Sequence, residues 1–463
     1  MVNKNKNRII LFNISSTVIL QGITFISGPI FSSILGTNNY GVAAVYLTWV
    51  QIASTVFSLQ AAGTIAQAKV SFSDEVQIEY QSSVFSLATP AYLGCAGITV
   101  IVSMLASRWV NINLAMIITG LLHGWGLYCV TAMNLKFTYE FKADKNFILS
   151  VTVTLLNVGL SILLISLFPK DINYWGRIIA QSGVYTVTGI ILFAFILRSG
   201  RTVYNRTYWM FSLPIAIPTI FHLLAHIVLG QSDKIMLQNM VGNSAAGIYA
   251  LACTFGAVLQ TLYNAFNNSW VPFYYDYTKN KRFDDLKNHA RNYRELFTIL
   301  SMGFILLARE VFHIYANKDF WGGTDLIPLF ALGFYFVFLY SFPVNYEFYN
   351  KRTKTIALGT SGAALLNIVL NYILIRIWGI QGAVIATASS HGLQFFFHYF
   401  CARRINPGEF PFKMADFMPG LFAVCGTCVF YWLTKEMWFI RWAAGAALGI
   451  YILPKIVKRK EIF

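Results

Sequence analysis

The segment from 209 to 241 carries the ionisable side chains whose types and spacing are best suited to chemistry. His222, His226 and Asp233 share one face of a helix, because eleven residues advance it by about 1100°, roughly 20° beyond three turns. Lys234 follows directly in the same apolar surroundings. Intramembrane acidic and basic residues are costly unless paired or hydrated, so they mark a candidate functional site. The alternatives are a structural Asp233–Lys234 ion pair and histidines packed against a neighbouring helix.

Uncharged polar side chains recur at helical spacing on several other apolar segments. The candidates that could line a hydrated cavity with the residues above are Asn13, Thr17, Gln21, Gln51, Gln181, Asn264, Asn367 and His391. Any one of them taken alone is better explained as a contact that holds two membrane helices together. Their recurrence on several helices favours a groove lined by hydrogen-bonding groups.

The elements that must position these residues are membrane-spanning helices. Of 463 residues, 56% are hydrophobic and 12% are charged, against about 25% charged in soluble domains. A crossing needs about 20 apolar residues, and the sequence contains fourteen such segments with short connections. They are 9–35, 41–66, 82–106, 112–132, 147–168, 176–197, 209–241, 245–266, 293–310, 326–346, 355–376, 380–400, 416–433 and 437–453. This excludes a soluble enzyme and a large extramembrane domain. The longest connection, 270–291, is predicted to be an amphipathic or interfacial segment.

The distribution of basic residues predicts the orientation of these helices. The net charge is +16, and 26 of the 35 Lys and Arg lie on the side of the N-terminus. Positive charge collects on the cytoplasmic side of membrane proteins, so both termini are predicted to be cytoplasmic. The basic residues sit in short loops rather than along one face, which argues against nucleic acid as a partner. The six cysteines and seven histidines show no metal-ligand spacing, and no nucleotide-binding loop occurs.

Two turns and two helix starts repeat with the same separation. The turns Leu35–Gly41 and Val241–Gly247 are 206 residues apart, as are the helix starts at Gly176 and Gly382. An offset of six helices preserves direction, so the chain is predicted to hold two parallel six-helix repeats that can alternate access to a central cavity. The predicted domains are a first lobe at 1–206, a second lobe at 207–402, and two additional helices with a basic tail at 403–463.

The chain resembles the polysaccharide transporter branch of the MOP exporter superfamily, which includes the Wzx-type O-antigen flippases. The resemblance covers most of the chain and rests on Leu35–Gly41, Ser232-Asp233-Lys234 leading into Gly242–Tyr249, Trp270-x-Pro272, and Asn367 and Asn371 followed by Gly379–Gly382. It implies an all-α polytopic protein with MATE-like lobes. It also implies a non-enzymatic flippase that moves an undecaprenyl-diphosphate-linked oligosaccharide, an O-antigen or capsule repeat unit, across the bacterial inner membrane.

The resemblance extends to partners and energy source. It implies that an ion gradient, of H⁺ or Na⁺, drives the cycle without a bound cofactor. A polysaccharide polymerase and a chain-length regulator are the expected protein partners, beside membrane lipids. A diphosphate needs positive charge, and Lys234, Arg177 and Arg376 are the candidates to bind it, although both arginines could instead snorkel to the interface.

Three other kinds of membrane protein remain as alternatives. A flippase for the peptidoglycan precursor is expected to have an arginine-rich cavity in its first helices, and no arginine occurs between Arg8 and Arg108. A cation-coupled multidrug exporter of the same superfamily needs acidic residues in its cavity, and the first predicted helix has none between Arg8 and Leu35. A membrane polysaccharide polymerase would place its chemistry on a large outer loop, and the longest outer loop, 311–325, has only some fifteen residues.

Overall fold

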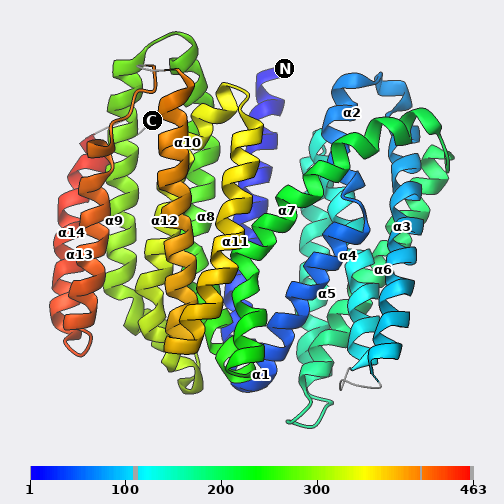
Figure 1. Ribbon diagram of the computed structural model, residues 1–463, viewed down its shortest axis with the longest axis horizontal. Coiled ribbons are helices and arrows are strands. Elements are labelled where there is room, and N and C mark those ends of the chain that lie inside the picture. Colours follow the sequence, from blue (N-terminus) through cyan, green and yellow to red (C-terminus); the bar gives the residue numbers. More distant parts are fainter. Residues whose placement is uncertain (1, 108–112, 407–408, 459–463) are drawn as a thin grey trace. The chain divides into compact units, whose positions relative to one another are not determined.

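The computed structural model describes residues 2–107, 113–406 and 409–458, with side chains from 19 to 452 inside those ranges. Every regular element in these ranges is a helix (Figure 1). The α-helices are α1 (Val2–Phe57), α2 (Ile65–Ser71), α3 (Gln77–Ala106), α4 (Leu114–Tyr139), α5 (Ala143–Ile165), α6 (Tyr174–Gly200), α7 (Arg206–Met240), α8 (Asn243–Lys279), α9 (Phe283–Tyr315), α10 (Ile327–Tyr349), α11 (Thr353–Trp378), α12 (Ile380–Ile405), α13 (Met418–Leu433) and α14 (Trp438–Lys458). Short 3₁₀ segments are η1 (Ala61–Thr64), η2 (Asp74–Val76), η3 (Lys318–Leu326) and η4 (Met414–Asp416).

The outer faces of the helices are apolar. Ten helices in the described ranges are long and apolar enough to cross a membrane, and α13 and the described part of α14 are shorter apolar helices. Leu163, Ile191 and Leu365 are each more than half exposed. Lipid hydrocarbon suits such surfaces, and helices satisfy their own backbone hydrogen bonds there. The chain is therefore a multi-pass membrane protein.

The first helix contains two spans. Its backbone breaks at Gly36 (φ 68°, ψ 175°), so α1 together with α3–α14 supplies fourteen long helical segments in the described part of the chain. This confirms the predicted fold class. The second predicted span, 41–66, ends earlier, at Phe57, because Leu59 and Gln60 take left-handed backbone angles (φ 55° and 48°). A right-handed helix cannot continue through such angles, and η1 and α2 follow instead.

The α8–α9 pair extends beyond its predicted spans. We expected helices at 245–266 and 293–310, but α8 runs on to Lys279 and α9 starts at Phe283. With 37 residues, α8 is about 55 Å long, well over the roughly 30 Å of the hydrocarbon core. The predicted interfacial segment is thus a helical hairpin. Apolar composition could not reveal it, because a helix that leaves the bilayer becomes polar.

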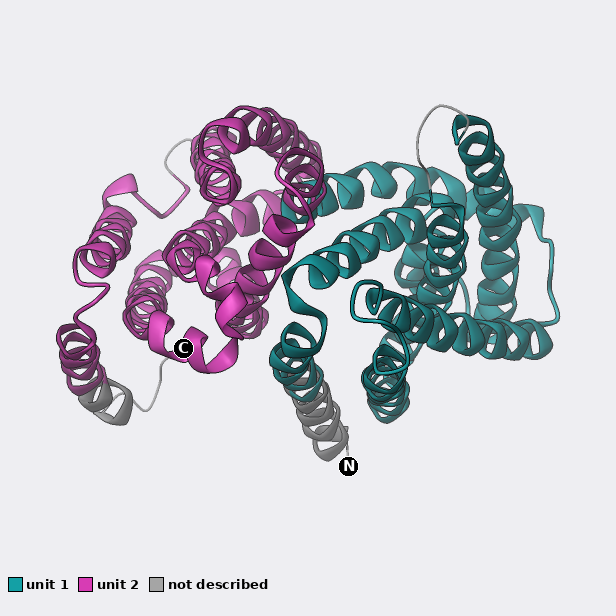
Figure 2. Ribbon diagram, turned by 90° about the horizontal axis from the view of Figure 1, so that it is seen from below, with its two compact units in different colours: residues 1–231 teal, residues 232–463 magenta. Residues whose placement is uncertain are grey.

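The chain forms two compact units, Met1–Gln231 and Ser232–Phe463, which meet inside α7 (Figure 2). In unit 1, α6 packs on α4 and α5, and α1 packs on α4. In unit 2, α12 packs on α10 and α11, and α8 packs on α10. The same pattern of neighbours therefore recurs six helices later in the chain. The domain boundaries predicted at 206 and 402 remain predictions.

Glycines mark equivalent places in the two units. Gly36 and Gly242 both combine positive φ with extended ψ, 68° and 175° against 125° and 170°. At the start of α6, a Cβ on Gly176 would lie 2.5 Å from the backbone nitrogen of Ile165. At the start of α12, a Cβ on Gly382 would lie 2.0 Å from the carbonyl oxygen of Leu374. In both units the glycine lets a helix cross the end of its predecessor, as parallel repeats require.

Replacing Gly382 by alanine should destabilise the protein. The Leu374 carbonyl belongs to the backbone of α11 and cannot move aside as a side chain can, so we expect a loss of about 2 kcal/mol. The measurement is the folded fraction after heating, followed by fluorescence-detected size-exclusion chromatography. Gly362→Ala is the matched control, because a Cβ at Gly362 meets nothing within 4 Å. Equal stability of the two variants would contradict the close crossing of α11 and α12.

The two C-terminal helices are tied to α9 by charged side chains. The Nη1 and Nη2 atoms of Arg309 each donate to one carboxylate oxygen of Glu436, at 2.9 Å. Glu436 lies in the turn between α13 and α14. This bidentate bond holds the pKa of Glu436 below its usual range. One residue further along α9, Glu310 accepts a hydrogen bond from Arg441, which is fully buried. These charges hold one end of α13 and α14 against α9.

Candidate substrate and ion sites

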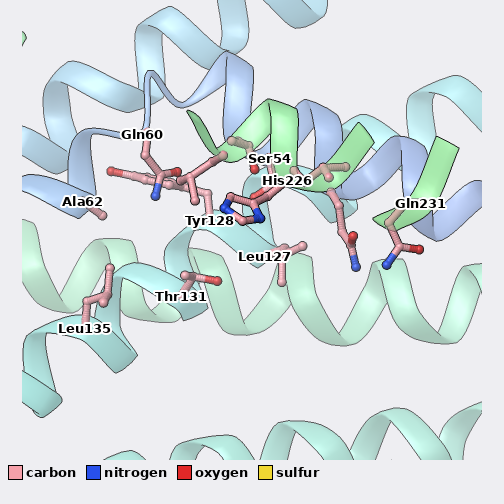
Figure 3. Close-up of a pocket in the computed structure, with 13 residues that line it drawn as sticks. Ser54, Gln60, Ala62, Leu127, Tyr128, Thr131, Leu135, His226 and Gln231 are labelled. Atoms are coloured by element: carbon pink, nitrogen blue, oxygen red, sulfur yellow. The ribbon is translucent and has the colours of Figure 1, made fainter. Parts of the chain in front are cut away.

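Unit 1 holds a cavity of about 450 Å³ with a mixed polar and apolar lining, between α1, the η1 segment, α4 and α7 (Figure 3). Helical spacing brings its residues together: each helix contributes side chains three or four positions apart, which share a face. Its lining is Gln51, Ser54, Thr55, Gln60, Ala62, Leu127, Tyr128, Thr131, Leu135, Leu223, His226, Ile227 and Gln231. No acidic side chain, lysine or arginine is among these lining residues.

The chemistry of this lining is that of a neutral hydrogen-bonding surface. The amides of Gln51, Gln60 and Gln231 offer both donors and acceptors, and the hydroxyl of Thr131 can do either. Three leucines, Ile227, Ala62 and the ring of Tyr128 contribute the apolar part of the wall. Sugar hydroxyls also donate and accept, and their C–H faces are apolar. A lining of this kind therefore suits a carbohydrate better than an ion.

Two histidines of α7 lie beside this cavity. The rings of His222 and His226 meet edge to face, with centroids 4.7 Å apart. Of the two, His226 lines the cavity and is exposed. The shared role predicted for His222, His226 and Asp233 stays a prediction.

Asp233 lies at the centre of a buried polar cluster in unit 2. Its side chain is 1% exposed. One carboxylate oxygen accepts hydrogen bonds from the Thr387 hydroxyl (2.6 Å) and the Tyr249 hydroxyl. The other accepts one from Asn371 Nδ2 (2.5 Å). Four helices, α7, α8, α11 and α12, therefore converge on one carboxylate.

Asn367 extends the same cluster by one shell. Its Oδ1 accepts hydrogen bonds from Ser232 Oγ (3.1 Å) and from Asn371 Nδ2 (3.0 Å). Its Nδ2 donates to Thr387 Oγ1 (3.2 Å). Carboxylate, amide and hydroxyl oxygens gathered in this way are the ligands that hard cations prefer, and a buried carboxylate can also take up a proton. The described residues hold no group of three or more His, Cys, Asp or Glu that could bind a metal ion.

The structure brings some predicted site residues together and leaves others apart. Gln51 and His226 line the cavity of unit 1, and Asp233 and Asn367 belong to the cluster of unit 2. The remaining candidates with described side chains are placed as follows: Gln21 and Asn264 are exposed, Gln181 is buried in α6, and His222, Lys234 and His391 are half-buried. The side chains of Asn13 and Thr17 lie outside the described residues. The roles assigned to all of these side chains remain predictions.

The two candidate arginines for a diphosphate stack on aromatic rings within their own units. The Arg177 guanidinium carbon lies 4.2 Å from the ring centroid of Phe31 and 5.4 Å from that of Tyr40. The corresponding distance from Arg376 to Tyr372 is 3.9 Å. Stacking leaves the edge of a guanidinium available for hydrogen bonds, and Arg177 Nε has no hydrogen-bond partner among the described residues.

Sequence reasoning missed several residues of both sites. Gln60, Thr131 and Gln231 line the cavity but are not among the polar candidates predicted from the sequence. Tyr249 was read only as part of a motif, although its hydroxyl donates to Asp233. A signal was present for Asn371, which stands one helical turn after Asn367.

Comparisons with known proteins identify the family. The profile of the family described as "Polysaccharide biosynthesis protein" matches residues 7–277, more than half of the chain. The chain belongs to this family. Among solved structures it is similar to the lipid II flippase MurJ in an inward closed conformation, at 18% identity and a TM-score of 0.69, over 96% of this chain and 100% of that one. An inward-facing multidrug resistance MATE family transporter of the MOP superfamily is similar at 12% identity and a TM-score of 0.53, over 89% and 95% of the two chains.

The present chain is also similar to two proteins of Haemophilus influenzae. An uncharacterized membrane protein is 23% identical over 220 residues, 45% of this chain and 53% of that protein. The Lsg locus putative protein 1 is 24% identical over 147 residues, 31% of this chain and 37% of that protein. The chain thus spans about half or less of the length of these curated relatives. The solved structures show that the family member has the fold shared by MurJ and MATE transporters.

Proposed function

We propose that this protein is a flippase that moves an undecaprenyl-diphosphate-linked oligosaccharide, an O-antigen or capsule repeat unit, across the bacterial inner membrane by alternating access. The observation that carries the proposal is the uncharged, hydrogen-bonding cavity of unit 1 inside a protein of the polysaccharide biosynthesis family. A lipid-linked sugar needs a polar passage for its head group while its tail stays in the hydrocarbon. Both termini then face the cytoplasm, as the 26 basic residues on that side predict.

The Asp233 cluster is the proposed coupling site for H⁺ or Na⁺. A buried carboxylate surrounded by three neutral donors becomes stable when a cation or proton neutralises it. Binding a proton or cation there changes which of these hydrogen bonds the carboxylate can accept, and so alters the contacts between α7, α8, α11 and α12. An ion gradient can therefore bias the two states of the transporter. No cofactor enters this scheme, and the proposed protein partners are a polysaccharide polymerase and a chain-length regulator.

A cation-coupled multidrug exporter is the competing function, supported by the fold shared with the MATE transporter. A site for cationic drugs needs acidic groups at its wall, because a desolvated cation requires a counter-charge. The thirteen residues that line the cavity include none. The composition of the cavity therefore favours the carbohydrate.

Deleting the gene tests the proposed function in its native host. We expect the completed lipid-linked repeat unit to accumulate on the cytoplasmic face and surface polysaccharide to disappear. The measurement is the amount of lipid-linked oligosaccharide accessible to glycosidase in inverted and in right-side-out membrane vesicles. Normal delivery of lipid-linked units to the outer face would contradict the proposal, and drug export would be assayed next.

A further inference from the structure

Unit 2 contains a second buried carboxylate, which has no role in the proposed coupling at Asp233. Glu347 of α10 and His398 of α12 are both 0% exposed. The Nδ1 atom of His398 lies 2.6 Å from Glu347 Oε2. On the far side of each group, Glu347 Oε1 and His398 Nε2 have no hydrogen-bond partner among the described residues. A titratable pair is therefore buried with half of its hydrogen-bonding capacity unused.

The space for this pair is built into the neighbouring helices. A Cβ on Gly359 of α11 would lie 2.2 Å from His398 Nε2, so only glycine at this position admits the imidazole. The ring of Tyr340 on α10 meets the imidazole edge to face, with centroids 5.0 Å apart. The pair thus sits in a fitted site between α10, α11 and α12.

The unused nitrogen is the atom at which the pair can accept a proton. When neutral His398 donates its Nδ1–H to Glu347, the lone pair of Nε2 is left as an acceptor, and the pair carries one negative charge in apolar surroundings. A proton that bonds to Nε2 converts the imidazole to imidazolium, and the pair becomes neutral overall. Because burial disfavours net charge, the carboxylate supplies the driving force for taking up one proton.

A polar stripe on α12 connects this pair with the Asp233 cluster. Thr387, His391, Gln394 and His398 follow at intervals of four, three and four residues, which keeps them on one face over about 16 Å. Thr387 at one end donates to Asp233. Gln394 is buried, and its Nε2 has no hydrogen-bond partner among the described residues. Buried polar groups of this kind usually bind an ordered water.

Few other titratable groups surround the pair. Tyr340 of α10 and Cys401 of α12 interact electrostatically with Glu347, and Arg404 of α12 acts on Cys401. From α11, no acidic, basic or histidine side chain occurs between Lys354 and Arg376. The next titratable side chain along the α12 stripe is His391, two turns before His398.

We propose that Glu347 and His398 form a proton-binding site at the cytoplasmic end of a proton path through unit 2, whose outer end is Asp233. The proton reaches Asp233 from outside, passes along the α12 stripe to His398 Nε2, and leaves to the cytoplasm when that N–H bond breaks. This rests on the proposed ion-coupled transport and identifies H⁺ as the ion. The basic segments after α10 and α12 predict that this end faces the cytoplasm.

The test counts the protons bound by the purified full-length protein, without any oligosaccharide. The protein in lipid nanodiscs is titrated between about pH 8 and about pH 5, the range in which an imidazole titrates. We expect Glu347→Gln to bind one proton fewer than the wild type, because the imidazole alone would have to take on a net charge in apolar surroundings. The double variant with His398→Asn should bind no fewer protons than Glu347→Gln, because the two groups act as one site. The amide oxygen introduced by Glu347→Gln still accepts the bond from His398 Nδ1–H, so this variant is expected to fold.

Glu140→Gln is the matched control at a carboxylate of unit 1. Burial raises the pKa of Glu140, but hydrogen bonds from Lys136 and Lys142 outweigh it and hold the pKa below its usual range. Its removal should therefore leave the proton count unchanged. Equal counts for wild type and Glu347→Gln would overturn the proposal, as would a further loss in the double variant. The wild-type protein could bind one proton more than Glu347→Gln and still move no oligosaccharide in vesicles. That result would contradict the proposed function alone.

Discussion

Replacing Asp233 by asparagine should abolish ion-driven transport while leaving the amount of folded protein in the membrane unchanged. Asparagine has the same shape, and its oxygen can still accept from Thr387 or Tyr249. The negative charge that attracts a cation or proton is lost. We expect delivery of oligosaccharide to the outer face to fall to the background of the deletion strain, measured by restoration of surface polysaccharide.

A control in the same cluster separates charge from packing. Thr387→Ser keeps the hydroxyl that donates to Asp233 and removes only a methyl group, so it should retain most of the activity. Protein levels of both variants are compared by immunoblot of washed membranes. Full activity of Asp233→Asn would contradict the coupling role of the carboxylate. Loss of the folded protein would show that the cluster serves structure instead.

Filling the cavity of unit 1 should block transport almost as completely. Thr131 of α4 lines the cavity and is exposed there, so tryptophan at this position can extend into the open volume without displacing the core. We expect Thr131→Trp to insert and fold normally but to lower surface polysaccharide to near the deletion background, because the head group loses its passage.

The opposite face of the same helix provides the control. Leu122 is nine residues earlier, which places it about 180° from Thr131, and it is 48% exposed outside the cavity lining. Leu122→Trp introduces the same tryptophan side chain at a lipid-facing position, and the protein with this substitution should transport normally. If Thr131→Trp and Leu122→Trp are equally active, the cavity is not the passage of the substrate.

The fold could be predicted from the sequence because its strongest determinants are local. Runs of apolar residues define spans, and the alternation of basic loops orders them. The breaks at Gly36 and Gly242 and the crossings at Gly176 and Gly382 follow from residues whose type alone indicates special backbone geometry. Polar helix ends, such as the α8–α9 hairpin, leave no apolar signal, so their lengths were underestimated.

The candidate sites were only partly predictable. Asp233 stands out as a rare acidic residue in an apolar helix, but its donor Asn371 is 138 residues away. Periodicity shows which side chains share a face of one helix and gives no register between helices. For this reason Gln51 and His226 were identified as cavity candidates, whereas Thr131 was not. Asn264, chosen by the same periodicity, is exposed on α8.

The most direct test of the proposed function uses purified protein in liposomes that contain the lipid-linked oligosaccharide accumulated by the deletion strain. The fraction of oligosaccharide cleaved by a membrane-impermeant glycosidase is measured before and after an ion gradient is imposed. We predict that the gradient changes this fraction in wild-type liposomes and leaves it unchanged in Asp233→Asn liposomes. A wild-type fraction that matches protein-free liposomes, with and without the gradient, would contradict the assignment as a flippase.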